Sequence, residues 1–218
     1  MPGGHISIST LIHSIGDKER RSTKFPAILT RAVFNLTGNT QYKMKNIEIR
    51  KITVDDIDDL QKIGRQTFYE TFSSGNTEEN MKTYLHKDFA LDKLTIELTD
   101  NNSEFYLATL GDNVIGYLKL NFGASQTELK DDKALEIERI YVLKEFYGKK
   151  VGQILYDKAI EVARQKNTDY VWLGVWEENP RAISFYKKNG FVEFDKHIFK
   201  LGNDEQTDIM MKLELEKE

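Results

Sequence analysis

Strand-like and helix-like segments follow one another in a definite order from Ile47 onward, and this order restricts the fold more than any other feature. The apolar runs "EFYLATL" and "VIGYLKLNF" are separated by Gly111-Asp112-Asn113, which is typical of a β-hairpin turn. Next come the strand-like run "ALEIERIYVL", the helical pattern "VGQILYDKAIEVARQK", the strand-like run "YVWLGVW", a second helix and two further strands. Antiparallel strands followed by such a β-α-β-α-β run predict an α/β (α+β) domain with a mixed sheet.

Three more helices are expected between the opening strand at Ile47 and the hairpin. The first follows Val54-Asp55-Asp56, and the third covers about Leu91 to Leu98. The second begins after Thr77, which has Asn80 three residues further on, so only part of a capping box is present.

The first 43 residues differ from the rest of the chain, because they hold six basic residues against two acidic ones and lack clean periodicity. We therefore divide the chain into an N-terminal extension, residues 1–43, and one domain, residues 44–218. Three interpretations of the extension compete: an upstream segment that is non-native or has no catalytic role, a disordered arm, or an organellar presequence. We favour the first.

Composition excludes several classes of protein. A net charge of −4 and a pI near 5.7 argue against nucleic-acid binding, and the absence of a long apolar run argues against a membrane-spanning helix. The chain has no cysteine, which excludes disulfides, thiolate metal sites and a cysteine nucleophile and is compatible with a cytoplasmic protein. No metal site is expected, since four histidines are scattered without ligand spacing: His5, His13, His86 and His197.

The segment "FYGKKVGQILYDKA" predicts a phosphate-binding helix start. Gly148 and Gly152 allow a tight turn, the helix presents free N–H groups, and Lys149 and Lys150 add positive charge. The segment matches neither a Walker loop nor GxGxxG, and two glycines and two lysines before a helix also occur by chance.

The segment "EENPRAISFYKKNGF" predicts a short helix with a marked start and stop. Asn179 can cap the helix that Pro180 opens, and Asn189-Gly190 can end it in a left-handed turn. Tyr186 follows the best buried position and stands next to two lysines, so its phenol is either core packing or a functional group.

These two segments, in this order, resemble motifs A and B of the GNAT acetyltransferase superfamily. The resemblance covers roughly residues 47–215 and is greatest to bacterial spermidine/spermine N-acetyltransferases of the PaiA type, through "FYETFSSGNTEENMKTYL", "LEIERIYV", "WLGVWEENPRAISFYKKNGFV" and "HIFKLGNDEQTD". It implies the GNAT fold: a mixed, mostly antiparallel central sheet, splayed between two central parallel strands and flanked by helices. Two positions depart from the family pattern, since Tyr147 stands where Arg or Gln is usual and Lys150 where glycine is usual.

The resemblance implies acetyl-CoA as co-substrate. Backbone groups of "IYV" would pair with its pantetheine arm, and the glycine-bearing helix start would hold its diphosphate. The residues it assigns to cofactor binding are Ile140, Tyr141, Val142, Tyr147, Gly148, Lys149, Lys150, Val151, Gly152, Gln153, Asn179, Ala182, Phe185, Tyr186 and Lys188.

The reaction needs a proton acceptor, because only about one amine in two thousand is unprotonated at pH 7 when its pKa is about 10.4. Glu138, or a water chain ending at it, is the favoured base, with Glu136 as the alternative. The non-catalytic interpretation of both glutamates is a solvated strand edge paired to Arg139. The apolar alternation changes face near Glu138-Arg139, which predicts a β-bulge. By the resemblance, the N–H of Val142 polarises the thioester carbonyl and Tyr186 protonates the leaving thiolate.

A polyamine is the expected small-molecule substrate, and its positive charges call for an acidic groove. Candidate groups are Glu70, Glu78, Glu79 and Glu136, although acids on helices usually form only a solvated face. Direct attack in a ternary complex is expected. The alternatives are acetylation of a protein N-terminus or another small amine, or a CoA-sensing module without turnover. The resemblance also implies that two copies of the chain can form a homodimer.

Overall fold

The computed structural model describes residues 8–9, 47–201 and 204–216. These residues form an eight-stranded mixed sheet with the strand order β2-β3-β4-β5-β6-β8-β7, and β1 pairs with β5 outside this path. Among the described pairs, only β5–β6 and β1–β5 are parallel. The strands are β1 (Ile8–Ser9), β2 (Ile47–Lys51), β3 (Ser103–Leu110), β4 (Asn113–Phe122), β5 (Ala134–Val142), β6 (Tyr170–Trp176), β7 (Val192–Leu201) and β8 (Asp204–Glu214).

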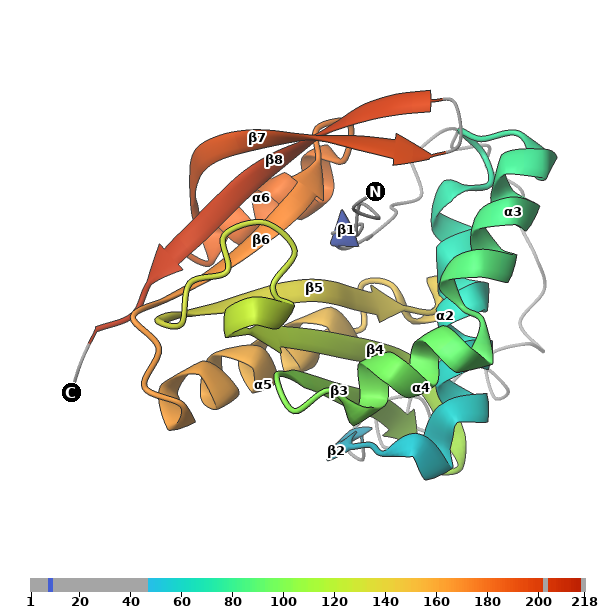
Figure 1. Cartoon of the computed structure of the whole chain (residues 1–218), viewed down its shortest axis with the longest axis horizontal. Coiled ribbons are helices and arrows are strands. Elements are labelled where there is room, and N and C mark those ends of the chain that lie inside the picture. Colours follow the sequence, from blue (N-terminus) through green and yellow to red (C-terminus); the bar gives the residue numbers. More distant parts are fainter. Residues whose placement is uncertain (1–7, 10–46, 202–203, 217–218) are drawn as a thin grey trace, which may run out of the picture.

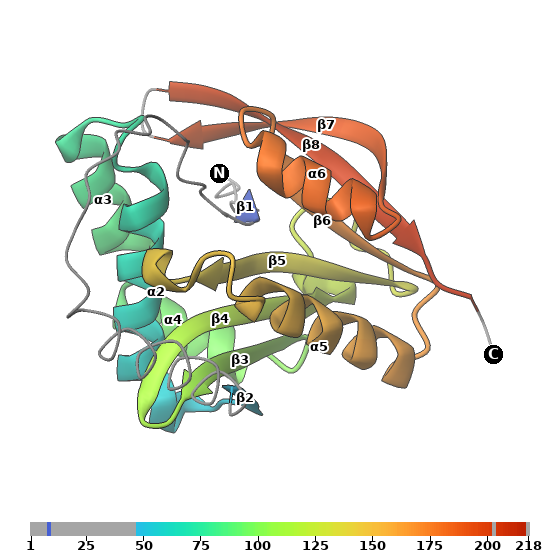
Figure 2. The ribbon, with the colours of Figure 1, turned by 180° about the vertical axis from the view of Figure 1, so that it is seen from behind.

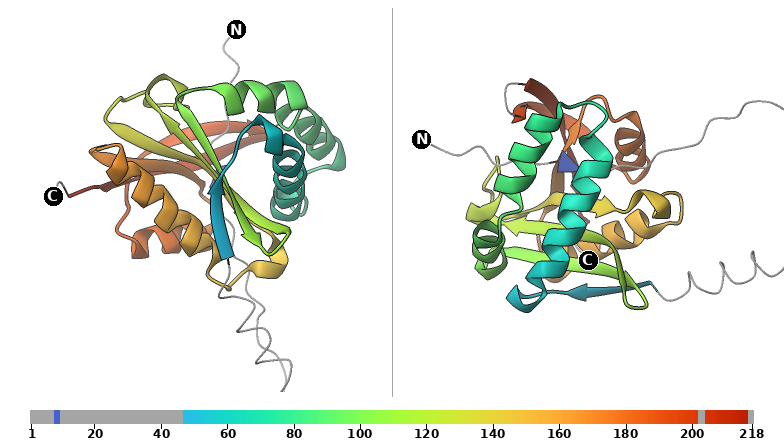
Figure 3. Two further views of the ribbon diagram at one scale, coloured as in Figure 1. Left: turned by 90° about the horizontal axis from the view of Figure 1, so that it is seen from below. Right: turned by 90° about the vertical axis from the view of Figure 1, so that its right-hand side faces the viewer.

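Helices cover both faces of the sheet (Figure 1). One face, here called the α2 face, packs against α2 (Ile57–Phe72), α3 (Glu78–Asp88) and α4 (Leu91–Thr99). The opposite α5 face packs against α5 (Val151–Gln165) and α6 (Pro180–Lys188), which lie in front of the sheet in Figure 2. Figure 3 shows the sheet between these two helical layers, so the predicted fold is confirmed. Short 3-10 turns cover Val54–Asp56, Gly123–Ser125 and Lys144–Phe146.

Local sequence signals account for the helix and turn boundaries. The Oγ1 of Thr77 accepts a hydrogen bond from the backbone N of Asn80 at 3.2 Å, which confirms the partial cap before α3. Gly111 adopts φ +59° in the β3–β4 turn and Gly190 adopts φ +91° after α6, as the hairpin and helix-stop predictions require.

Strand alternation divides the core into two apolar layers. On β5, Ile140 and Val142 join the cluster on the α5 face, while Tyr141 between them joins the cluster on the α2 face. Both layers exclude water, since Leu155 in the α5-face cluster and Leu107 in the α2-face cluster are completely buried. The sheet is therefore a rigid platform between two closed layers.

The predicted N-terminal extension falls outside the described residues except for β1. β7 and β8 are longer than the strands expected near Phe191 and "DIMMKLEL", because they form one long hairpin that pairs from Val192–Lys212 to Leu201–Asp204. In the described part of the chain, no helix combines the length and the apolar character needed to cross a membrane.

Candidate active site

The parallel strands β5 and β6 separate soon after they begin. Their pairing covers only Ala134–Glu136 against Tyr170–Trp172, although the described strands continue to Val142 and Trp176. Figure 1 shows β6 turning away from β5, with β1 in the space between them. We call the region between residues 137–142 of β5 and 173–176 of β6 the β5–β6 wedge; it confirms the predicted splay.

A β-bulge lies on β5 at the start of the wedge. Lys119 of β4 pairs with Arg139, whereas the next residue, Leu120, pairs with Ile137, so Glu138 is the extra residue. The bulge confirms the predicted change of face, because it lets Ile137 and Ile140 both join the α5-face cluster.

Backbone groups of β5 point into the wedge at alternate residues. The backbone N of Leu143 donates a hydrogen bond to the carbonyl O of Ile115, at the start of β4, at 2.9 Å. In an antiparallel ladder every second residue forms such hydrogen bonds, so Leu143 and Tyr141 use their backbone groups to bond β4. The N–H and C=O groups of Ile140 and Val142 therefore point the other way, into the wedge. Those of Tyr141 point toward β4, so Tyr141 does not share the backbone role predicted for the "IYV" segment as a whole. In this structure, Ser9 of β1 is the ladder partner of Ile140.

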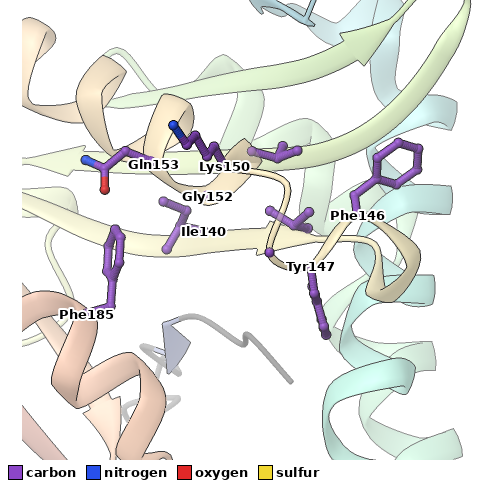
Figure 4. Close-up of a pocket in the computed structure, with 10 residues that line it drawn as sticks. Ile140, Phe146, Tyr147, Lys150, Gly152, Gln153 and Phe185 are labelled. Atoms are coloured by element: carbon purple, nitrogen blue, oxygen red, sulfur yellow. The ribbon is translucent and has the colours of Figure 1, made fainter. Parts of the chain in front are cut away.

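The loop before α5 forms a pocket beside the wedge (Figure 4). Gly148 has φ +73° and Lys150 has φ +65°, so the chain takes a left-handed conformation just before the helix. This conformation explains why the motif that this segment resembles has glycine at position 150. Lys150 adopts the conformation at a steric cost. The pocket is lined by Ile140, Val142, Phe146, Tyr147, Gly148, Lys150, Val151, Gly152, Gln153 and Phe185.

Gly148 and Gly152 leave open space where a side chain would project. A Cβ atom built on either residue meets no atom of the described residues within 4 Å. Lys149 and Lys150 are exposed at the same helix start, and Lys149 Nζ lies 4.8 Å from the centre of the Phe146 ring. Free N–H groups, two cations and unfilled space fit a diphosphate.

The α6 residues lie on the other side of this pocket. Asn179 Oδ1 accepts a hydrogen bond from Ala182 N at 3.1 Å, so the predicted cap is confirmed. The side chains of Ala182 and Tyr186 are fully buried, and Phe185 reaches the pocket lining. Lys188 is exposed near the end of the helix.

A buried charge network surrounds Glu138 on the α2 face. Lys119 Nζ lies 2.6 Å from Glu138 Oε2 and 3.0 Å from Glu97 Oε2, while Arg139 contacts Glu138 at 3.0 Å and Glu97 at 3.1 Å. Burial alone would raise the pKa of Glu138, but Lys119 and then Arg139 lower it below its ordinary value. In the same way Arg139 and Lys119 lower the pKa of Glu97 to about 2 against the effect of burial. Glu138 is therefore held as a carboxylate and is a weak proton acceptor.

Glu136 has the opposite electrostatic environment. Burial, followed by the negative charge of Glu138, raises the pKa of Glu136 to about 7. Its carboxylate accepts hydrogen bonds from Thr127 N at 2.8 Å, Thr127 Oγ1 at 2.6 Å and Asn121 Nδ2 at 3.1 Å. Asn121 also donates to Glu138 at 2.5 Å and so links the two carboxylates.

The predicted substrate-binding acids do not gather in one place. Glu70 accepts a hydrogen bond from Lys144 N at 2.8 Å and so fastens the loop after β5 to α2. Glu78 and Glu79 are exposed in the first turn of α3, where negative charge also favours the helix dipole. Glu136 alone among the four is fully buried on the sheet.

The sequence prediction named Arg139 as a pairing partner of the glutamates, which the contact with Glu138 at 3.0 Å confirms. It missed Lys119, Glu97 and one further acid. Lys119 and Glu97 are about as buried as core residues, and Asp208 on β8 is only 1% exposed. The available signal was a charged residue at an inward position of an otherwise apolar strand, as in "YLKLNF" and "TDIMM".

Comparisons with known proteins agree with this geometry. A model described as the acetyltransferase (GNAT) family matches residues 59–191. An uncharacterized N-acetyltransferase in the pepI 3' region of Lactobacillus delbrueckii subsp. lactis is 38% identical over 169 residues, which cover 78% of this chain and 98% of that protein. Spermidine N(1)-acetyltransferase of Thermoplasma acidophilum is 28% identical over 150 residues, covering 67% of this chain and 88% of that protein.

A solved structure extends the comparison. PaiA N-acetyltransferase from Thermoplasma acidophilum, crystallised in complex with coenzyme A, matches with a TM-score of 0.65 and 25% identity over 78% of this chain and 99% of that chain. Because the family model spans more than half of the sequence and the splayed sheet is present, this chain belongs to the acetyltransferase (GNAT) family.

Proposed function

We propose that this enzyme transfers the acetyl group of acetyl-CoA to a primary amine of a polyamine, spermidine or spermine, by direct attack in a ternary complex. The observation that carries the proposal is the β5–β6 wedge, where β6 does not pair with Ile140 and Val142 and their backbone groups point into the wedge next to a cationic helix start. The resemblance to a spermidine N(1)-acetyltransferase supports the polyamine as substrate class.

The pocket residues fit the parts of acetyl-CoA. The helix start with Gly148, Lys149, Lys150 and Gly152 would hold the diphosphate, because it combines free N–H groups, positive charge and open space. Ile140 and Val142 would bind the pantetheine arm through their backbone, with Phe185 packing beside it. When bound, acetyl-CoA supplies the activated acetyl group.

Three groups of this chain would carry the proton and charge chemistry. The N–H of Val142 would stabilise negative charge on the thioester oxygen, and the Tyr186 hydroxyl would donate a proton to the leaving sulfur. The proton removed from the amine would pass toward the carboxylates of Glu136 and Glu138, which Asn121 links by hydrogen bonds. Of these two carboxylates, the pKa of Glu136, about 7, suits proton uptake at neutral pH better than the lowered pKa of Glu138.

An assay of thiol release tests the proposal. Acetyl-CoA is incubated with the enzyme and with spermidine, spermine, lysine or a short peptide, and the acetylated product is identified by mass spectrometry. We expect kcat/KM for the two polyamines to exceed that for lysine and peptide by about tenfold or more, a difference of 1.4 kcal/mol in transition-state binding. Preference for the peptide would favour N-terminal acetylation. Coenzyme A binding without thiol release from any amine would favour the sensing module.

A further inference from the structure

Asp208 is a buried carboxylate on β8 to which the proposed reaction assigns no role. It lies on β8 directly opposite Trp176 of β6 and opposite His197 of β7, so the three side chains share one face of the sheet. The Asp208 side chain is 1% exposed, although its neighbours Ile209 and Met210 are apolar packing residues.

The Asp208 carboxylate has no partner among the described residues. None of them donates a hydrogen bond to Oδ1 or Oδ2. The Nδ1 of His197 lies 3.3 Å from a carboxylate oxygen of Glu128. The charged group that acts on Asp208 is Glu177, which is also negatively charged. Burial and then Glu177 raise the pKa of Asp208 to about 7. Burying a carboxylate without an opposite charge or a hydrogen-bond donor costs several kcal/mol of free energy. A bound cation that pairs with Asp208 would recover this free energy.

The surroundings of Asp208 suit an organic ammonium ion. Asp208 shares the α2 face with Trp176, whose ring centre lies 6.3 Å from that of Phe72. Asp208 also lies beside the wedge, because its ladder partner Trp176 is the last residue of β6 along the wedge. A carboxylate beside aromatic rings is the combination that recognises ammonium groups through charge and cation–π attraction.

We propose that Asp208 binds an ammonium group of the acceptor amine at the α2-face side of the β5–β6 wedge, with Trp176 as the adjoining aromatic surface. The inference rests on the proposed function, and it names the residue that selects a cationic acceptor. It also favours Asp208 over the exposed Glu78 and Glu79, because one buried carboxylate attracts an ammonium more strongly than two solvated ones.

The test compares Asp208→Asn and Asp208→Glu with the wild-type enzyme, and Asp195→Asn, at an exposed position of β7, is the matched control. Steady-state kinetics give KM for spermidine and for acetyl-CoA. Titration calorimetry with spermidine, in the presence of coenzyme A, gives the affinity without turnover, and thermal melting at pH 8 monitors folding.

For Asp208→Asn we expect KM and Kd for spermidine to rise about tenfold to a hundredfold, with KM for acetyl-CoA unchanged and Tm equal to or above that of the wild type. Asp208→Glu restores part of the affinity, and Asp195→Asn changes nothing. Unchanged spermidine affinity in Asp208→Asn overturns the inference while leaving the proposed function in place. A wild-type enzyme that binds no amine overturns both. Equal loss of spermidine and acetyl-CoA binding with a lowered Tm overturns the inference in favour of a structural role.

Discussion

At the scale of single residues, Tyr186 offers the most direct test of chemistry. Its ring is fully buried and packs edge-on against Phe185 at 5.3 Å between centres, so Tyr186→Phe removes the hydroxyl and keeps the packing. We expect kcat to fall about a hundredfold or more, with little change in the Kd of coenzyme A, because the loss is confined to proton donation. Thiol release and calorimetry measure the two quantities. An unchanged kcat would remove Tyr186 from the proposed chemistry.

The raised pKa of Asp208 makes a second prediction, for the pH dependence of stability. The pKa is about 7 in the folded protein and 3.8 ordinarily, so the folded state retains a proton that the unfolded chain releases. This contribution to stability is complete below pH 4 and is lost as pH rises through 7. The titratable groups that bear on Asp208 are His197, its ladder partner on β7, and Glu177 and Tyr141, which interact with it electrostatically.

Asp208→Asn cannot lose a proton, so its free energy of unfolding should exceed that of the wild type by about 1–4 kcal/mol at pH 8. The difference should shrink as pH falls to 5. Urea unfolding of both proteins across this range measures it. A difference that does not depend on pH would contradict the assigned environment of Asp208.

At the scale of elements, a substitution at the start of α5 should change ligand binding without lowering the stability of the helix. Gly152 lies in the first turn, and in the described part of the chain a Cβ there meets nothing within 4 Å. Gly152→Leu should leave Tm unchanged or higher, because leucine favours helix by about 0.5–1 kcal/mol over glycine. The Kd of coenzyme A should rise at least about tenfold, since the new side chain fills the space assigned to the diphosphate.

Gly64→Ala in α2 is the contrasting variant. There a Cβ atom would lie 2.3 Å from the Phe89 ring, so we expect a lower Tm with no direct effect on coenzyme A binding. If the Kd of coenzyme A rises in Gly152→Leu only as far as its loss of thermal stability explains, the assignment of this space to the diphosphate is refuted.

The first strand leads to a prediction about the N-terminal extension. Ser9 of β1 is the ladder partner of Ile140, the residue whose backbone is assigned to pantetheine, so the two partners exclude each other. A chain beginning at Met44 should bind coenzyme A at least as tightly as the full chain, and more tightly by the free energy of the β1 pairing. Calorimetry on both proteins decides this. Weaker binding by the shorter chain would instead give the extension a supporting role.

At the scale of the whole molecule, one buried charge network joins three elements. Lys119 of β4 bridges Glu97 of α4 and Glu138 of β5 while only 3% exposed. Lys119→Met should lower the free energy of unfolding by about 3–5 kcal/mol, because two carboxylates then lose a buried partner. Lys196→Met, which breaks an exposed pair with Glu177, should cost under about 1 kcal/mol. Urea unfolding compares them, and similar losses would contradict the structural role of the network.

Much of the fold could be predicted from local patterns. The hairpin at Gly111, the α6 cap at Asn179 and the strand "YVWLGVW" each depend on residues that are close in sequence, and all three are observed. The bulge at Glu138 was also predictable, because the apolar alternation of a single strand records it. The rest of the charge network around Glu138 was not, since Glu97 and Lys119 come from separate elements and only packing brings them to one point.

The sequence by itself determined the order of strands and helices, the glycine-bearing start of α5, the capped start of α6 and the position of the bulge. These features follow from backbone conformation and side-chain periodicity, which act over a few residues. Only the tertiary structure decided which carboxylates are paired and which are not, since an ionisable group takes its environment from elements distant in the chain. Glu138 lies between two cations and Asp208 faces no described donor, although the sequence marks each simply as an acid in a strand.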